Sequence, residues 1–227
     1  NADGYESALS DFIPLKALAM DQLVDYDFET DSNAGQILDE SGFNNSGKIL
    51  SDTSGQTGNT GLIAGKDGEG QAYQFNNTFL EISSGFQLDV SKNFVVQADV
   101  YPTATDGNYR RIFNQYDGLG NSFLLDYNAA VGSLRLFTNG GTNNYTKVVT
   151  IPQNQWSTIR LEYTAPSAEA ANGSVKVYLN DEMVMHVENL SYPLGNSTVG
   201  MRIGGDSDGN PISTWQGAMD NIRIENG

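Results

Sequence analysis

Apolar and polar residues alternate through the closing part of the chain, from Trp156 to Glu225. Four segments show the alternation, with Gly, Asn, Asp or Pro between them: QWSTIRLEYTA, GSVKVYLNDEMVMHV, TVGMRIGG and WQGAMDNIRIEN. A period of two sends successive side chains to opposite faces of a strand. The pattern therefore predicts four short antiparallel strands with one buried and one solvated face.

Shorter runs of the same kind occur upstream. The expected strands are LVDYDFE, QAYQFNN, FLEIS, NFVVQADVYPT, YRRIFNQYD, NSFLLDYN, SLRLFTN and YTKVVTI. The stretch LSDTSGQTGNTGLIAGKDGEG is rich in Gly, Thr and Ser and predicts a long irregular loop. No segment resembles the helix of a βαβ crossover. Many short strands separated by turn signals predict an all-β protein, a two-sheet antiparallel β-sandwich of the jelly-roll type.

The domain boundaries follow from where this alternation starts. Residues 22–227 are expected to form one domain, since sandwiches of this length commonly fold as a unit. Residues 1–21 are expected to be a linker or N-terminal extension, because ESALSDFIPLKALAM is interrupted by Pro14 and lacks alternation. Alternatively, Phe12, Ile13 and Leu15 form an extra edge segment that packs on the sandwich, and the sequence favours neither possibility.

Charge narrows the range of partners. The chain has 28 acidic and 12 basic residues and a net charge of −16, which repels phosphate backbones and anionic lipid surfaces. No apolar run approaches the roughly 20 residues that cross a bilayer. Neither nucleic acid nor membrane insertion is expected. The carboxylates suit hard cations such as calcium, whereas the absence of Cys excludes disulfides and thiolate metal sites.

Ordered motifs along residues 22–226 resemble the concanavalin A-like lectin/glucanase superfamily, in particular its laminin-G-like jelly-roll domains from secreted bacterial proteins. The N-terminal motifs are DYDFE, an Asp-x-Ser-Gly-x-x-Asn-x-Gly loop, GQAYQF and NFVVQADVYP; the loop supplies Asp39, Ser41, Gly42, Asn45 and Gly47. The closing motifs supply Trp156, Lys176, Tyr178, Asn180, Ile203, Gly204, Gly217, Asp220 and Arg223. Asp181 and Asp99 depart from the pattern, where Gly and Trp are usual.

The resemblance implies a structural calcium ion held between the first strand, the loop after it and the last strand. The matching positions are Asp27, Glu29, Asp39, Asn45 (through its carbonyl) and Asp220. Such an ion would tie both ends of the domain together. A simpler alternative is that Asp39 caps a turn and Asp220 bonds loop amides.

Catalysis is not expected. Spacing two in VDYDFET places Asp25, Asp27 and Glu29 on one side of a strand, as paired carboxylates of glucanases require. The resemblance, however, puts this strand at an edge rather than in a cleft. His186, the single His, alternates with apolar residues and is expected at a strand surface.

Sugar binding needs aromatic faces and planar polar groups. The candidate ligand residues are Tyr109, Arg110, Arg111, Asn114, Tyr116, Tyr127, Arg135, Tyr145 and Trp215. In RRIFNQYD, alternation puts Arg111, Phe113 and Gln115 on one face and Arg110, Ile112, Asn114 and Tyr116 on the other, and one of these faces must be core. The two adjacent Arg could neutralise a uronate or sulfate, or pair with Asp117 and Asp126. Trp215 is the best stacking candidate, with rim packing as its alternative.

The function expected from the resemblance is a non-catalytic carbohydrate-binding module of a larger secreted enzyme or adhesin. It would bind a polysaccharide on the concave face or the loop rim, with structural calcium, and would be part of a secreted or cell-surface protein that carries other domains. The alternatives are a protein-binding or spacer domain and, less favoured, a glycan-cleaving enzyme.

Overall fold

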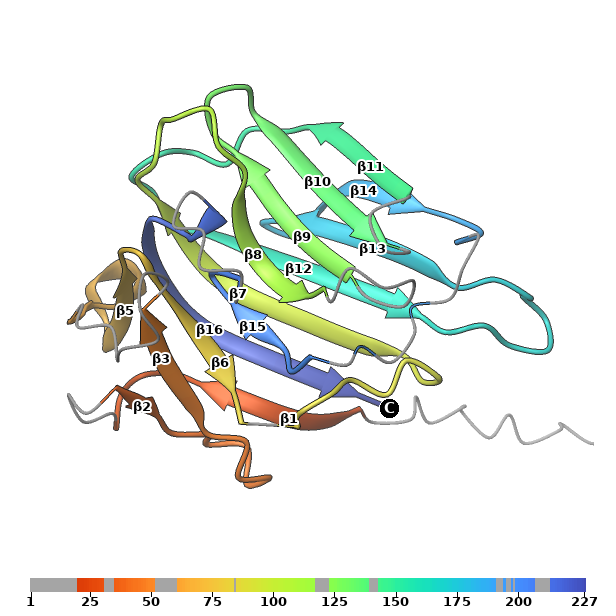
Figure 1. Cartoon of the computed structure of the whole chain (residues 1–227), viewed down its shortest axis with the longest axis horizontal. Coiled ribbons are helices and arrows are strands. Elements are labelled where there is room, and N and C mark those ends of the chain that lie inside the picture. The colour runs from red at the N-terminus through yellow and green to blue at the C-terminus, as the bar shows by residue number, and fades with distance from the viewer. Residues whose placement is uncertain are drawn as a thin grey trace, which may run out of the picture.

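The computed structural model describes residues 20–30, 35–51, 61–83, 85–116, 123–138, 143–190, 194, 197, 199–206 and 213–227. These form two antiparallel sheets packed face to face, as the alternation predicts (Figure 1). The helical element with described bounds is the 3₁₀ turn η1 (Lys66–Gly68). None of the helices described there is long and apolar enough to cross a membrane.

The first sheet has the strand order β14-β13-β12-β7-β16-β5-β4, and β1 also pairs with β16. Its strands are β1 (Asp21–Tyr26), β4 (Leu62–Ala64), β5 (Gln71–Phe75), β7 (Phe94–Pro102), β12 (Ser157–Thr164), β13 (Ser174–Leu179), β14 (Glu182–Val187) and β16 (Gly217–Asn226).

The second sheet has the order β11-β10-β9-β8-β15-β6-β3-β2. Its strands are β2 (Gln36–Ile37), β3 (Gly47–Ser51), β6 (Thr78–Ile82), β8 (Arg110–Gln115), β9 (Phe123–Asn128), β10 (Ser133–Thr138), β11 (Asn143–Val148) and β15 (Arg202–Ile203). In Figure 1 the strands β8 to β10 lie over β7 and β12 of the first sheet.

The core fills the space between the sheets with the inward side chains of both. Phe94 of β7 links the layers, because its ring centre lies 5.7 Å from that of Phe123 in β9 and 4.9 Å from that of Tyr163 in β12. All three side chains are buried. Aromatic pairs at these distances stabilise a core beyond the area that they bury.

The structure departs from the predicted elements in two places. GSVKVYLNDEMVMHV is a hairpin of β13 and β14, because Asn180 and Asp181 both adopt positive φ, 48° and 64°. Such a pair matches the two-residue turn that the twist of a hairpin favours. The predicted loop after Leu50 begins with the end of β3 and contains β4, while its residues 52–60 lie outside the described ranges.

The strand β16 changes its pairing partner along its length. Gly217 to Met219 pair with β5, whereas Ile222 to Asn226 pair with β1. The register against β7 shifts between Asp220 and Arg223, and Asn221 has φ 46°. A β-bulge therefore sits where the end of β1 and the start of β5 meet.

Candidate functional site

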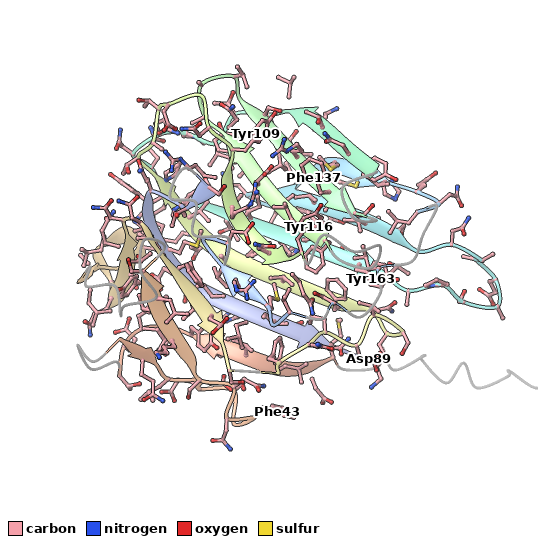
Figure 2. All side chains as sticks on the ribbon, viewed as in Figure 1. Phe43, Asp89, Tyr109, Tyr116, Phe137 and Tyr163 are labelled. Carbon is pink, nitrogen blue, oxygen red and sulfur yellow. The ribbon has the colours of Figure 1, made fainter. Side chains whose placement is uncertain are left out.

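The outer surface of β8, β9 and β10 carries a connected set of charged and aromatic side chains, here called the polar face. Its members are Tyr109, Arg111, Asn114, Tyr116, Asp126, Arg135 and Phe137; Figure 2 labels its three aromatic side chains over the second sheet. Strand register pairs Arg111 with Asp126, and Asp126 with Arg135. Directly opposed residues share a face of the sheet, so the three charges form a row across it.

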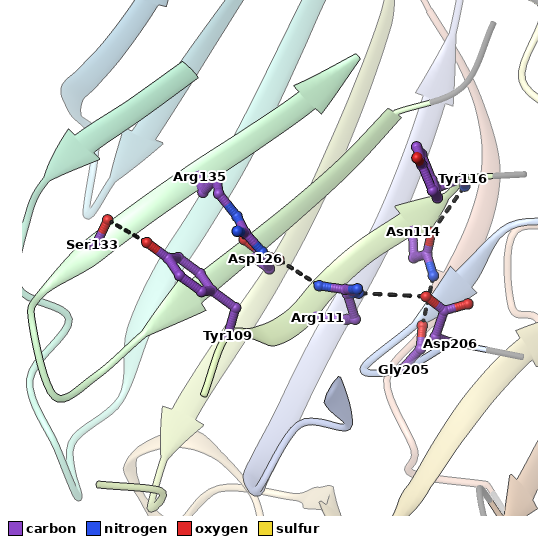
Figure 3. Close-up of polar contacts among 9 residues, drawn as sticks. All are labelled: Tyr109, Arg111, Asn114, Tyr116, Asp126, Ser133, Arg135, Gly205 and Asp206. Carbon is purple, nitrogen blue, oxygen red and sulfur yellow. Dashed lines mark hydrogen bonds and ion pairs between the residues drawn. The ribbon is translucent and has the colours of Figure 1, made fainter. Parts of the chain in front are cut away.

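Asp126 is the anchor of this row (Figure 3). Its side chain is fully buried, and its carboxylate accepts hydrogen bonds from Arg111 Nη1 at 2.5 Å and from Arg135 Nε and Nη2 at 2.9 and 2.6 Å. Burial raises the pKa of Asp126, although both guanidinium groups act in the opposite direction. The carboxylate therefore fixes two guanidinium planes at the surface.

Aromatic rings hold Arg135 from both sides. Its guanidinium carbon lies 3.6 Å from the ring centre of Tyr109 and 4.3 Å from that of Phe137. The Tyr109 hydroxyl hydrogen-bonds Ser133 Oγ at 3.1 Å, which fixes the first ring. A guanidinium that is stacked and doubly bonded loses little entropy when it meets a ligand.

The other end of the polar face is tied to the segment after β15. Arg111 forms an ion pair with Asp206 at 3.5 Å. Asn114 is fully buried, donates to the Gly205 carbonyl at 3.0 Å and accepts from the Tyr116 backbone N–H at 2.9 Å. Asn114 is thus a structural residue, whereas Tyr116 keeps part of its surface open.

A β-bulge in β8 overturns the predicted alternation of RRIFNQYD. The register shifts between Arg111 and Phe113, and Ile112 and Phe113 both join the core. Arg110 is 5% exposed, donates to the Thr214 carbonyl at 3.0 Å and pairs with Asp106. The prediction that places Arg110 at a ligand surface is therefore wrong, and of the two adjacent Arg only Arg111 pairs with Asp126.

Two predicted stacking residues lie in the core instead. Trp215 is 1% exposed, and its indole N–H donates to the Ala218 carbonyl at 3.3 Å. Tyr127 is 2% exposed, and its hydroxyl accepts from the Ile151 backbone N–H at 2.9 Å. Neither ring offers a face to a sugar in this conformation. Tyr145 is partly buried against the core and lies off the polar face.

Phe137 belongs to the polar face but was not among the predicted ligand residues. Its spacing of two from Arg135 puts both side chains on one side of β10, and this spacing is visible in the sequence. What the sequence does not show is which side of β10 faces out.

The residues predicted to bind calcium fall into separate groups. Asp39 accepts backbone N–H bonds from Asp25, Ser41 and Asn45 at 3.0, 3.0 and 2.8 Å, and the Asn45 carbonyl accepts a short bond from the Tyr26 hydroxyl. This is the turn-capping arrangement that the sequence left open as the alternative. Asp39 therefore organises the loop between β1 and β3.

The predicted row of carboxylates after β1 does not form. The strand ends at Tyr26, and Phe28 has φ 62°, so Asp27 and Glu29 do not continue the face that Asp25 occupies. Asp27 instead accepts the Glu29 backbone N–H at 3.0 Å, and Asp25 pairs with Arg223 at 3.3 Å. His186 is exposed on β14, as expected.

Glu29 and Asp220 line an acidic pocket of about 540 Å³ at the β16 bulge. Its other lining residues are Lys66, Asp67, Glu69, Gly70, Asp99 and Asn221. Asp220 accepts backbone N–H bonds from Lys66 and Asn221 at 3.0 and 2.7 Å. Burial raises the pKa of Asp220, those amide bonds lower it, and the negative charges of Asp99 and Glu29 raise it again. Lys66 is the one cation in the lining, and its ammonium lies 3.0 Å from Asp99.

The structure does not bring the five predicted calcium positions together at one point. Among the described residues, no three Asp, Glu or His side chains are grouped so that they could hold a metal ion. Asp39 and Asn45 lie in one loop, whereas Glu29 and Asp220 line the acidic pocket, and Asp220 and Asp39 are bonded to backbone amides. Calcium stays a prediction from the resemblance, and these five residues do not assemble around one point.

Asp39 should make stability depend on pH. Burial raises its pKa, but hydrogen bonds from Asp25, Asn45 and Ser41 outweigh this and lower the pKa below 3.8. The carboxylate thus contributes stability above pH 3.8 that is lost as the pH falls through the folded-state value. We expect Asp39→Asn to lower the free energy of unfolding by about 2 kcal/mol at pH 7 and by less near pH 3. Urea unfolding across this range measures the difference; a cost that does not shrink toward low pH would contradict the assignment.

Comparison with known protein families finds one match over most of the chain. The model described as "Concanavalin A-like lectin/glucanases superfamily" matches residues 67–227. Comparison with curated proteins finds no match.

Solved structures share the fold at low sequence identity. Domain 4 of AbnA, a GH43 extracellular arabinanase from Geobacillus stearothermophilus solved with arabinotriose, has a TM-score of 0.67 and 19% identity over 92% of this chain and 93% of its own. The binding domain of botulinum neurotoxin serotype D has a TM-score of 0.63 and 10% identity, over 90% of this chain and 48% of its own. The binding domain of Paraclostridial Mosquitocidal Protein 1 has a TM-score of 0.61 and 13% identity, over 90% and 48%. This chain thus corresponds to nearly all of the arabinanase domain and to about half of each toxin chain.

Proposed function

The chain belongs to the concanavalin A-like lectin/glucanase superfamily, and we propose that it is a non-catalytic carbohydrate-binding module whose polar face contacts a glycan. As in the arabinanase whose fourth domain shares the fold, the module would belong to a larger secreted or cell-surface protein. The neighbour's arabinotriose makes an oligosaccharide a reasonable first ligand to test, although at 19% identity the likeness itself concerns only the fold.

The observation that carries the proposal is the fixed position of Arg135. It is held between the Tyr109 and Phe137 rings and bonded twice to Asp126. Planar donors beside partly open aromatic rings are what sugar recognition requires, because rings cover C–H surfaces and planar groups bond hydroxyls. Since Asp126 has already ordered both guanidinium groups, binding would cost little side-chain entropy.

The competing functions fit this surface less well. A spacer domain predicts a sheet face without open aromatic rings, whereas Tyr109, Tyr116 and Phe137 are all partly exposed. A retaining or inverting glycosidase needs two carboxylates flanking one sugar bond. On the polar face, the Asp126 carboxylate is fully buried and bonded to two Arg.

The test is retention on affinity gels that contain neutral polysaccharides, arabinan among them, followed by titration calorimetry with the retained glycan. We expect Tyr116→Ala and Arg135→Ala each to weaken binding about tenfold, which corresponds to about 1.4 kcal/mol. Thermal unfolding of each variant shows whether the fold is kept.

Tyr178→Ala is the matched control. Tyr178 lies on β13 in the other sheet, and its ring also carries a guanidinium, that of Arg160 at 4.5 Å. Its loss removes an equivalent stacked pair away from the polar face and should leave the affinity unchanged. Equal weakening by all three variants, or no retention on any gel, would refute the proposal. Repeating the titration and the thermal unfolding with EGTA tests the calcium prediction: a lower unfolding temperature or a weaker affinity without calcium would support it, and no change in either would count against it.

A further inference from the structure

An apolar groove lies on the outer surface of the first sheet, away from the polar face. It is lined by Ile63, Ala64, Gly65, Gly68, Tyr101 and Trp156 and has a volume of about 370 Å³. Ile63 is 38% exposed, and Tyr101 and Trp156 are both partly exposed. Three large apolar side chains therefore meet at the surface of a chain whose net charge is −16.

The two rings are held in place by the fold. Tyr101 and Trp156 lie 5.3 Å apart between ring centres, at an interplanar angle of 57°. Tyr101 extends from the end of β7, and the turn that precedes Trp156 is fixed there, because the Asn154 backbone N–H donates to the Pro102 carbonyl at 2.9 Å. The tilted pair thus forms a rigid corner, which is an aromatic platform formed in advance of any ligand.

The facing wall is a loop with little side-chain bulk. A Cβ at Gly68 would meet nothing within 4 Å, so the space in front of this residue is open. Gly65 cannot carry a side chain, since its Cβ would lie 2.2 Å from the Glu69 carbonyl oxygen. The loop consequently leaves room for a flat ring against Trp156.

The acidic pocket continues the groove along the same strand. Asp99 and Tyr101 project from one face of β7 at spacing two, about 7 Å apart, and Asp67 lies in the loop between Gly65 and Gly68. The lining of the acidic pocket holds five carboxylates and one Lys. The carboxylates accept hydrogen bonds from hydroxyl groups and repel anions. Aromatic rings beside acceptor oxygens suit the apolar face and hydroxyl edge of an uncharged sugar.

We infer that this groove is a second glycan contact, in which Trp156 and Tyr101 stack on a sugar ring of a neutral oligosaccharide and the acidic pocket excludes uronate and sulfate glycans. The inference extends the proposed carbohydrate binding to a surface on the opposite sheet. It therefore predicts a module that can contact two chains, or two places on one chain.

Tryptophan fluorescence reports on the groove directly, because the chain has two Trp and Trp215 is 1% exposed. Acrylamide quenching acts on the partly exposed Trp156, so we expect quenching to fall when a neutral oligosaccharide binds. The probes are arabino-, xylo-, cello- and β-1,3-gluco-oligosaccharides, with oligogalacturonate as the anionic comparison. We expect protection by at least one neutral probe and affinity at least about tenfold weaker for oligogalacturonate.

Variants separate the groove from the polar face. Trp156→Ala should lower the affinity for the protecting oligosaccharide about tenfold, as measured by calorimetry. Trp156→Phe keeps a ring and should lower the affinity less. Tyr116→Ala should leave the protection of Trp156 unchanged even if gel retention falls. If the oligosaccharide protects Trp156 but the polar-face variants do not change glycan affinity, the polar face is not a glycan contact and the groove assignment stands. Absence of protection by every neutral probe, or equal binding of oligogalacturonate, would overturn the groove assignment whatever happens at the polar face.

Discussion

Replacing Trp215 by Ala is expected to lower the free energy of unfolding by about 3–5 kcal/mol, since deleting a buried Trp removes apolar contacts and leaves a cavity. Trp215 is 1% exposed within the core. Its backbone N–H donates to Gly204 at 2.7 Å and its indole N–H to Ala218 at 3.3 Å. Through its backbone and its side chain together, Trp215 thus joins the segment after β15 to the start of β16.

The loss of the two Trp side chains should differ in how much it lowers the free energy of unfolding. Trp156→Ala is the control, and because Trp156 is partly exposed we expect it to cost less than about 1.5 kcal/mol. Urea unfolding monitored by circular dichroism measures both variants on the same scale. A Trp215→Ala protein as stable as the wild type would show that the ring is not a core residue, and would restore it as a stacking candidate.

The fold could be predicted because its signal is spread over many positions. Alternation in segments such as STIRLEYT depends only on the period of a strand, and β12 occupies these residues with buried side chains at every second position. The sequence predicts strand boundaries less accurately where turn residues lie between two runs that alternate in the same way. Asn180 and Asp181 separate β13 from β14, and the Asn-Asp pair is a turn signal that the continuous run of apolar residues on either side obscured.

The candidate site could be predicted only in part, because local alternation does not say which face is buried. The bulge in β8 puts Ile112 and Phe113 in the core together, and no period in RRIFNQYD reveals it. The sequence placed Tyr109, Arg111 and Arg135 among the candidate ligand residues without saying which of them share a face, and the register of β8 to β10 puts Arg111 and Arg135 on either side of Asp126. Their role in binding stays a prediction.

Contacts between distant segments could not be predicted from the sequence either, because alternation is a local signal. The groove brings Ile63, Tyr101 and Trp156 together from three separate strands or loops, and they become neighbours only through the strand order β12-β7-β16-β5-β4. The acidic pocket likewise depends on the change of partner along β16. The acidic pocket lies at the bulge, with Asp99, Asp220 and Asn221 in its lining, and the groove begins two residues further along β7 at Tyr101.

The row of charges on the polar face should be as important for stability as for ligand binding. Asp126→Ala is expected to cost about 3–5 kcal/mol, because removing one partner of a buried ionic cluster leaves the others uncompensated. Asp126 is fully buried, whereas the Arg111 and Arg135 side chains are 15% and 19% exposed, so both cations would lose their shared partner at a poorly solvated surface.

Glu162→Ala provides the comparison for an exposed ion pair. Glu162 lies on β12 in the other sheet, 3.1 Å from Arg160, with 34% of its side chain exposed, and its loss should cost less than about 1 kcal/mol. Asp126→Asn keeps the shape and one acceptor oxygen, and should fall between the two. Urea unfolding orders the three variants. If Asp126→Ala costs no more than Glu162→Ala, the carboxylate does not organise Arg111 and Arg135, and the preformed guanidinium pair on which the proposed glycan contact rests would be lost with it.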